Sequence, residues 1–316
     1  MSDNISYTTE EIAKLLKISK LTVYDLIKKG ELPSYRVGKQ MRVDAIDLEA
    51  YKQRTKGIKI AARPIVVDPL VPFNPSASTN GLRPIVITGQ DISLDVLANH
   101  IEKTISGVRP LRSFVGSLDS LISMYRGESD IVSTHLLDGD TGEYNLPYIR
   151  KLLVGSSYLV VNLLLRWAGF YVQQGNPHQI RGWNDLKRQG IRLANREKGS
   201  GARVLLDEQL RLHGIQPNQI QGYASEESNH LGVAGKVSSG EADVGVGIEK
   251  AASIVSNVEF IPLIQERYDL VMMRKPANRI WIEHVIQILK SDAFQNELRA
   301  IPGYDLSLTG QVLYET

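Results

Sequence analysis

The sequence contains no cysteine among its 316 residues. This excludes disulfide bonds, thiolate metal sites and cysteine nucleophiles. The six histidines are scattered and do not have the spacing of a metal site. A chain without disulfides is compatible with a reducing compartment, and we expect a cytoplasmic protein that binds no metal cofactor.

Long apolar runs and a strong net charge are missing too. The most apolar stretch, Leu152 to Leu165, is interrupted by Gly155 and Asn162, so it is too short and too polar to span a bilayer. Met1 to Asn4 show neither the basic nor the apolar region of a signal peptide. The formal net charge is only +2, although residues 1–57 hold 11 Lys and Arg against 8 Asp and Glu. These features predict no membrane partner. The small net charge indicates neither for nor against binding to nucleic acid, so that prediction depends on sequence motifs.

Motifs of common enzymes are absent as well. In Lys198-Gly199-Ser200-Gly201 the lysine precedes the glycine, whereas a phosphate-binding P-loop has Lys followed by Ser or Thr after its last glycine. The sequence contains no Gly-x-Ser-x-Gly elbow and no His-Glu-x-x-His. We therefore expect a protein that is not an enzyme.

Residues 1–57 have the pattern of a small helical domain. Thr8 and Glu11 have the spacing of a capping box at the start of one helix. Ser19 can cap a second helix that continues to Lys29, and Gly30 follows as its C-terminal stop. Two helices joined by a tight turn form a helix-turn-helix.

The next residues extend this pattern. Leu32 to Val43 predict a hairpin with a basic tip, and Asp44 to Tyr51 predict a third, capped helix. The order of these features over residues 7–52 resembles the excisionase-type winged helix-turn-helix related to the MerR regulators.

The resemblance implies double-stranded DNA as a partner, with the second helix in the major groove and the hairpin against the backbone or the minor groove. A single module of this size covers little DNA, so we expect a homodimer on two half-sites. The lysines could instead form a solvated helix face. The candidate DNA-binding residues are Ser19, Lys20, Thr22, Val23, Tyr24 and Lys28 on the second helix, and Arg36, Lys39 and Arg42 on the hairpin.

Residues 58–81, rich in proline and small polar residues, predict a linker. Strand and helix patterns then alternate over 82–316, which is typical of an α/β domain with parallel strands. The expected strands are 84–89, 110–115, 130–134, 159–164, 191–195, 221–223, 242–247, 258–264 and 268–273. The expected helices are 91–104, 117–126, 183–187, 204–213, 230–239, 281–291 and 292–300.

The stretch Asn195 to Arg203 is the strongest candidate for a binding site in this domain. It joins an apolar strand to an amphipathic helix through Gly199-Ser200-Gly201. A glycine-rich turn at a helix start presents free backbone N–H groups and a favourable dipole to an anion. The same pattern also occurs as a plain structural turn in α/β proteins.

The segments "NREKGSGARVLLDEQL", "SNHLGVAGKVSSGEADVGVGIEKAA" and "IPGYDLSLTG" resemble the type II periplasmic-binding-protein fold, in the form attached to helix-turn-helix regulators and similar to the molybdate and tungstate binders. The resemblance covers about 82–316 and implies two lobes, one of 82–160 and 270–316 and one of 161–269. It implies a ligand, such as an oxyanion, in the cleft between the lobes. The candidate ligand-binding residues are Gln90, Ser117, Thr134, Arg196, Gly199, Ser200, Gly201, Arg203 and His230.

Taken together, the sequence predicts a ligand-responsive DNA-binding transcriptional regulator that senses a small molecule, for example molybdate or tungstate. The alternative is an excisionase-like architectural DNA-binding protein whose large domain only oligomerises. For single residues a structural role competes with ligand contact: Ser117, Thr134 and His230 could cap helices, and Arg203 could form a surface salt bridge.

Overall fold

The computed structural model describes residues 6–29, 32–37, 40–45, 47–48, 51 and 82–316. The chain divides into two compact units, Met1–Pro72 and Phe73–Thr316. Within the described residues no helix has both the length and the apolar character needed to cross a membrane.

The first unit contains the two expected helices. Helix α1 (Thr9–Leu16) starts at Thr8, which forms the expected capping box with Glu11, and α2 (Lys20–Lys28) starts at Ser19, whose hydroxyl accepts from the amide of Thr22. The turn between the helices uses Lys17 in the left-handed conformation, with φ of 54°. The prediction of a helix-turn-helix is confirmed, including the N-terminal cap of each helix.

A small antiparallel sheet completes this unit. Strands β2 (Tyr35–Val37) and β3 (Gln40–Asp44) form the expected hairpin, and β1 (Ser6–Thr8), which was not expected, pairs with β3. Of the expected third helix, residues 45, 47, 48 and 51 are helical, while Gly30 and Lys39 lie outside the described residues. The small core contains the fully buried Ile12, Val23, Leu32, Val43 and Leu48.

The second unit is built on one sheet with strand order β5-β4-β6-β11-β7-β10-β8-β9. Its strands are β4 (Arg83–Thr88), β5 (Val108–Ser113), β6 (Ile131–Thr134), β7 (Tyr158–Gln173), β8 (Leu193–Arg196), β9 (Glu226–Glu227), β10 (Val244–Ile248), β11 (Val258–Met273), β12 (Tyr304–Asp305) and β13 (Val312–Glu315). Its α-helices are α4 (Ser93–Thr104), α5 (Ser117–Arg126), α6 (Leu146–Leu152), α7 (Gly201–Leu212), α8 (His230–Ser238), α9 (Glu249–Ile254), α10 (Arg279–Lys290) and α11 (Asp292–Arg299).

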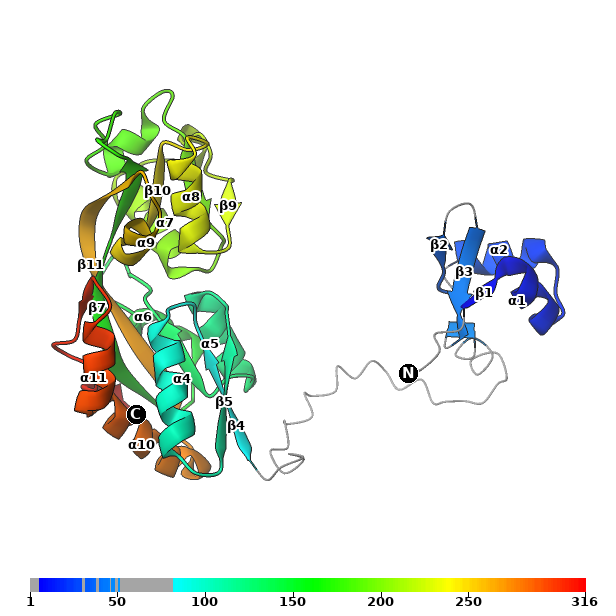
Figure 1. The fold of residues 1–316 in the computed structure, drawn as a ribbon, viewed down its shortest axis with the longest axis horizontal. Helices are drawn as coiled ribbons and strands as arrows, with labels where there is room; N and C mark the ends of the chain where they lie inside the picture. Colours follow the sequence, from blue (N-terminus) through cyan, green and yellow to red (C-terminus); the bar gives the residue numbers. More distant parts are fainter. Residues whose placement is uncertain (1–5, 30–31, 38–39, 46, 49–50, 52–81) are drawn as a thin grey trace. The chain divides into compact units, whose positions relative to one another are not determined.

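Two long strands divide this sheet into two lobes. Strands β7 and β11 pair antiparallel along their whole length and run from one lobe into the other (Figure 1). Leu163 and Leu164 of β7 pack into the core of the first lobe, whereas Ala168 and Phe170 pack into that of the second. The crossing therefore lies between residues 164 and 168, a few residues beyond the expected position near 160.

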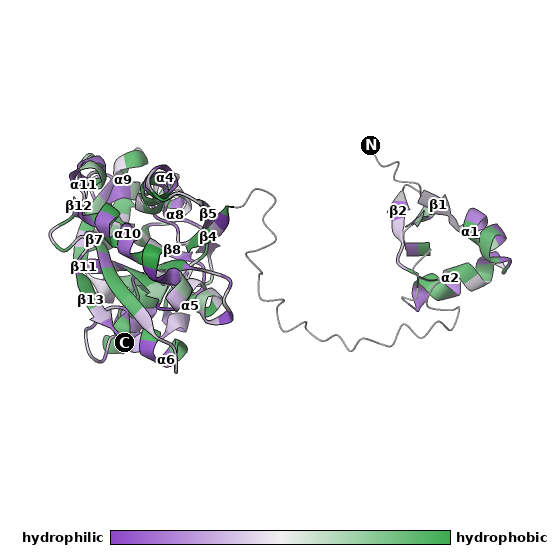
Figure 2. Ribbon diagram, turned by 90° about the horizontal axis from the view of Figure 1, so that it is seen from below, coloured by the Kyte–Doolittle hydropathy of each residue, from purple (hydrophilic) through white to green (hydrophobic). Residues whose placement is uncertain are grey.

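The helices cover the sheet with one apolar face each, and Figure 2 shows both hydropathy colours on them. In the first lobe α4, α10 and α11 bury residues such as Leu97, Val285 and Phe294 against the strands. In the second lobe α7 buries Leu205 and Leu206. The prediction of an α/β fold with two lobes is confirmed.

Several local expectations were wrong. Segments 159–164, 258–264 and 268–273 are strands as expected, but the strands do not end where polar residues interrupt the apolar pattern: they continue as the two long strands β7 and β11. Residues 221–223 form no strand: only Gln221 makes a bridge, to Arg192, and Gly222 has a φ of 87°. Residues 183–187 form a 3-10 helix. Helices α6 and α9 and strands β9, β12 and β13 were not expected.

Candidate ligand-binding cleft and nucleic-acid interface

An ion cluster lies at the base of the cleft, where the two long strands cross. Arg166 of β7 is directly opposite Glu266 of β11 in the strand register. Its guanidinium donates from Nε to Glu266 and from Nη1 to Asp91, at 2.5 Å in both cases. All three side chains are almost completely buried. Arg166 thus ties both crossing strands to the loop after β4.

Aromatic and imidazole groups surround this cluster. His135 Nδ1 lies 3.0 Å from Glu266, Tyr304 donates to Asp91 at 2.6 Å, and the guanidinium of Arg166 stacks on Tyr268. Burial opposes the ionisation of Glu266, but the charges of His135 and Arg166 lower its pKa to about 2. The carboxylates are therefore ionised at neutral pH, and the positive charge of Arg166 is already neutralised inside the protein.

Three helix starts meet above this cluster. The first-turn amides of Ser117, Gly201, Ala202 and His230, on α5, α7 and α8, donate to no carbonyl or side chain in the described part of the chain. Amides at this position have no partner within their own helix. Together with the helix dipoles, they form a region that favours negative charge without requiring a free cationic side chain.

These groups line a cavity of about 30 Å³. A single water needs roughly 10–15 Å³, so the enclosed space suits a ligand of a few heavy atoms. The cavity is lined by Gly89, Gln90, Asp91, Val115, Gly116, Ser117, Ser133, His135, Arg166, Arg196, Ser200, Gly201, Ala202, His230, Ile248 and Tyr268.

The lobes touch each other around the cavity. The amide of Leu118 donates to the carbonyl of Gly199 at 3.0 Å, and a Cβ on Gly116 would lie 2.9 Å from the same oxygen. On another side Gly139 donates to Glu208 at 2.8 Å. The loop that holds Gly139 packs on the core of the second lobe through Leu137 and Tyr144. The first contact joins α5, in the first lobe, to the turn before α7 in the second. The lobes are therefore closed over the cavity.

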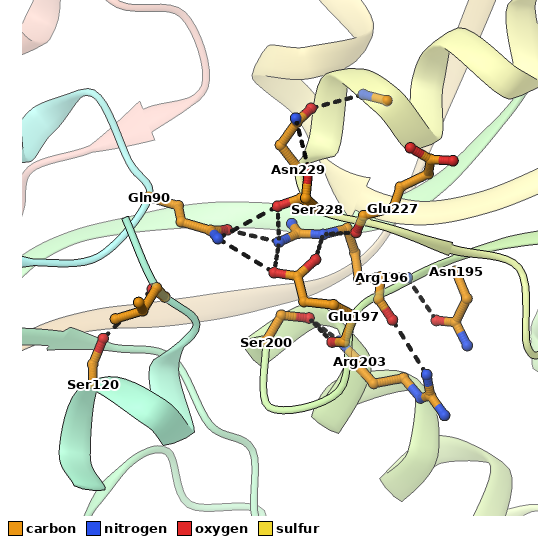
Figure 3. A network of polar contacts seen from close by, with 12 residues as sticks. Gln90, Ser120, Asn195, Arg196, Glu197, Ser200, Arg203, Glu227, Ser228 and Asn229 are labelled. Atoms are coloured by element: carbon orange, nitrogen blue, oxygen red, sulfur yellow. Dashed lines mark hydrogen bonds and ion pairs between the residues drawn. The ribbon is translucent and has the colours of Figure 1, made fainter. Parts of the chain in front are cut away.

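Six of the nine expected ligand-binding residues line this cavity: Gln90, Ser117, Arg196, Ser200, Gly201 and His230. Ser200 also caps α7, since its hydroxyl accepts from the amide of Arg203. Arg196 crosses the cleft to Gln90 and also binds Glu197 and the carbonyl of Ser228 (Figure 3).

The other three, Thr134, Gly199 and Arg203, do not line the cavity. Arg203 turns into the second lobe, where it pairs with Asp207 and Glu226 and stacks on Tyr223. Gly199 has a φ of 84° and uses its carbonyl to contact the opposite lobe. Thr134 is fully buried at the end of β6, opposite Asp269 of β11.

Five residues of the cavity and the ion cluster were not predicted from the sequence: Asp91, His135, Arg166, Tyr268 and Glu266. A signal was present in Arg166, the one charged residue of the apolar strand β7, whereas Glu266 lies in β11 among further charged residues. A charge in an apolar strand suggests a buried partner. Its identity could not be read from the sequence, because the two residues are 100 positions apart.

His230 is the polar side chain of the cavity with the fewest interactions. Its Nδ1 is buried and has no hydrogen-bond partner in the part of the chain that the structure describes. Burial, together with the charges of Arg196 and Arg166, holds the pKa of His230 well below its usual range. The imidazole is therefore neutral at pH 7 and can donate one hydrogen bond to a ligand.

The candidate DNA-binding residues lie in the first unit. Ser19, Lys20, Thr22, Tyr24 and Lys28 are exposed on α2 or at its start. Lys20 also pairs with Glu10 of α1. Val23 is an exception and a correction: its side chain is fully buried in the small core, so it cannot contact DNA.

The hairpin adds basic residues to this unit. Arg36 is exposed on β2, whereas Arg42 on β3 is half-buried and donates to Ser6 at 3.1 Å. Lys39 lies outside the described residues. An exposed helix and a basic strand in one small unit are the parts that a winged helix-turn-helix uses on DNA.

Comparison with known proteins assigns both units. The profile of the PBP superfamily domain matches residues 98–290. The chain belongs to the PBP superfamily. A helix-turn-helix domain matches residues 6–56, so this PBP-superfamily chain combines a DNA-binding type of domain with a ligand-binding type. Neither domain type is an enzyme family.

Two similar proteins show how far this organisation extends. The PBP-superfamily chain is 50% identical to the protein YvgK of Bacillus subtilis (strain 168) over 316 residues, the full length of both. A hydrogen-peroxide-bound OxyR mutant of Corynebacterium glutamicum has a TM-score of 0.51 at 13% identity, over 93% of this chain and 89% of that one. At this identity the OxyR structure shows a shared fold and nothing finer.

Replacing Arg166 should destabilise the second unit strongly. In Arg166→Met two buried carboxylates lose their counter-charge, a change that costs about 3–5 kcal/mol. The loss should be smaller at pH 5 than at pH 7, because the unpaired carboxyls can then take up protons. Urea unfolding followed by tryptophan fluorescence measures this unit alone, since Trp167, Trp183 and Trp281 all lie in it. The exposed Arg279→Met is the control, and an equal effect of both substitutions would contradict the role of Arg166.

His230 should make the stability of the second unit depend on pH. Its folded pKa is lowered, so as the pH falls below about 6.5 the unfolded chain takes up a proton first and the folded state loses stability. The loss cannot exceed about 1.4 kcal/mol per pH unit for one proton. Between pH 7.5 and pH 5.5, His230→Gln should lose less unfolding free energy than the wild type, whereas the exposed His213→Gln should behave like the wild type. Parallel pH profiles of all three proteins would refute the assignment.

Proposed function

We propose that this protein is a ligand-responsive DNA-binding transcriptional regulator that senses a small anion in the cleft of its PBP-like domain. The proposal rests mainly on one observation: the first residues of three helices, whose amides have no partner in the described part of the chain, line one small cavity. The helix-turn-helix unit supplies the output, and we expect a homodimer that acts on DNA in the cytoplasm.

The chemistry of the cavity favours an oxyanion as the effector. Arg166 is neutralised by Asp91 and Glu266, so the remaining attraction comes from N–H groups, hydroxyls and helix dipoles. A tetrahedral oxyanion offers only acceptor oxygens and matches such a set of donors. Molybdate and tungstate have this form and are small enough to be candidates. A nucleotide or another extended ligand would not fit in about 30 Å³.

Closure of the lobes is the proposed switch. Gln90 and Leu118 of the first lobe bind groups of the second, so these contacts form only when the cleft is closed. An anion that bridges the helix starts of both lobes binds the closed state more tightly than the open state. It therefore shifts the population toward closure by this difference in affinity.

Gly201→Ala should weaken anion binding by about tenfold or more, equivalent to about 1.4 kcal/mol. A Cβ at this position would lie 2.4–2.5 Å from ring atoms of His135, whose ring is held by Glu266. Thermal shift and calorimetry with molybdate, tungstate and sulfate measure the effect. Gly235→Ala on α8 is the matched control, because no atom lies within 4 Å of its added methyl group.

The result of this comparison tests the proposal directly. An anion effector should raise the melting temperature of the wild type and of Gly235→Ala, with less effect on Gly201→Ala. If none of the three anions binds the wild type, the oxyanion effector is wrong. If the protein binds DNA but no small molecule at all, the architectural alternative is favoured.

DNA binding should depend on the exposed face of α2. Lys28→Ala should weaken binding across all sequences and reduce the salt slope by about one, as expected for a lost phosphate contact. Fluorescence anisotropy with DNA from upstream of the protein's own gene, with and without molybdate, measures both affinity and response. Lys103→Ala, an exposed lysine on α4, is the control. Unchanged affinity and salt slope in Lys28→Ala would remove this helix face from the interface.

A further inference from the structure

The cleft contains a second, larger space above the enclosed cavity. This outer chamber has a volume of about 510 Å³ and is lined by Gln90, Phe114, Val115, Gly116, Asp119, Glu197, Ser228 and Asn229. Gln90, Val115 and Gly116 also line the inner cavity. Of these three, only Gln90 has a long polar side chain, and it lies between the two spaces.

Hydrogen bonds to the opposite lobe hold Gln90 in this position. Its Oε1 accepts from Arg196 at 2.6 Å, and its Nε2 lies 3.3 Å from a carboxylate oxygen of Glu197 and 3.4 Å from the carbonyl of Ser228. Figure 3 shows the amide of Gln90 reaching these three groups, all of which belong to the second lobe. An amide group has two donor hydrogens and one acceptor oxygen, so most of its capacity is already used. Gln90 is therefore better placed to close the site than to bind the ligand.

We propose that Gln90 is a gate that selects the effector by size, and that the effector is a bare inorganic oxyanion rather than an organic phosphate, sulfate or carboxylate. This inference rests on the anion effector proposed above and specifies its class. An oxyanion enclosed by the three helix starts leaves the bonds of Gln90 intact. An organic substituent on the same anion would have to pass through the position of the Gln90 amide.

The outer chamber reinforces this selection. Its rim carries the carboxylate of Asp119, and an anionic organic group extending into it would meet a charge of its own sign. The carboxylate of Glu197, also on the rim, is paired with Arg196. Arg196 is almost completely buried and is already bound to Glu197 and Gln90, so it leaves no free positive charge at the mouth. A substituted anion would therefore break the hydrogen bonds of Gln90 without forming new ones in the outer chamber.

Calorimetric titration of matched anions tests the gate. The wild type is titrated with molybdate, tungstate and sulfate, and then with phenyl phosphate and phenyl sulfate. We expect the best inorganic anion to bind at least about 100-fold more tightly than either phenyl ester, a difference of about 2.7 kcal/mol. Gln90→Ala, which joins the two spaces, should reduce this ratio to within about tenfold. Gln90→Asn, which is one methylene shorter, should give an intermediate ratio.

Gln219→Ala is the control, because Gln219 is exposed in the second lobe and lies outside both spaces. Tryptophan fluorescence verifies that each variant is folded. If the wild type binds phenyl esters as tightly as inorganic anions, or if Gln90→Ala keeps the wild-type ratio, the gate is wrong while the anion effector stands. If the wild type binds none of these anions, both the effector and the gate are wrong.

Discussion

The second unit depends on one buried cation. Arg166 lies where both crossing strands pass between the lobes. It forms ion pairs with Glu266 on the neighbouring strand and with Asp91 on the loop after β4. Burying this arginine is unfavourable unless its charge and its hydrogen bonds are satisfied. The two carboxylates satisfy them only if β7, β11 and the loop after β4 meet at this point. The cluster therefore fixes the base of the cleft, above which the rest of the site is assembled.

Neutralising the charge at the base has a consequence for recognition. With Arg166 paired to two acids, the donors left for the proposed anion are the amides at the helix starts and the hydroxyls. Such donors are fixed by the backbone and need little reorganisation when the ligand enters. They also have definite directions, so they distinguish a compact set of acceptor oxygens from a larger or differently shaped anion. Selection by geometry is what the proposed sensing of one small ion would require.

Much of this organisation could be anticipated from local patterns. The caps at Thr8 and Ser19 and the strand, turn and helix around Gly199 to Gly201 involve residues close together in the chain, so short-range rules describe them well. The same rules misjudged Arg203, which points into its own lobe, and Val23, which is buried. A local pattern places a residue at a turn or on a helix, but it does not determine which way a long side chain points.

The sequence by itself determined the two-part organisation, the helix-turn-helix and the glycine-rich turn before α7, because each depends on capping, periodicity and backbone freedom within a few residues. The tertiary structure alone decided which groups enclose the cavity. It joined Arg166 to Glu266, brought His135 against Gly201 and placed Gln90 on Arg196. These pairs are separated by many residues and meet only because two long strands carry the chain from one lobe to the other and back. Their contacts follow from the packing of the lobes, which no local rule specifies.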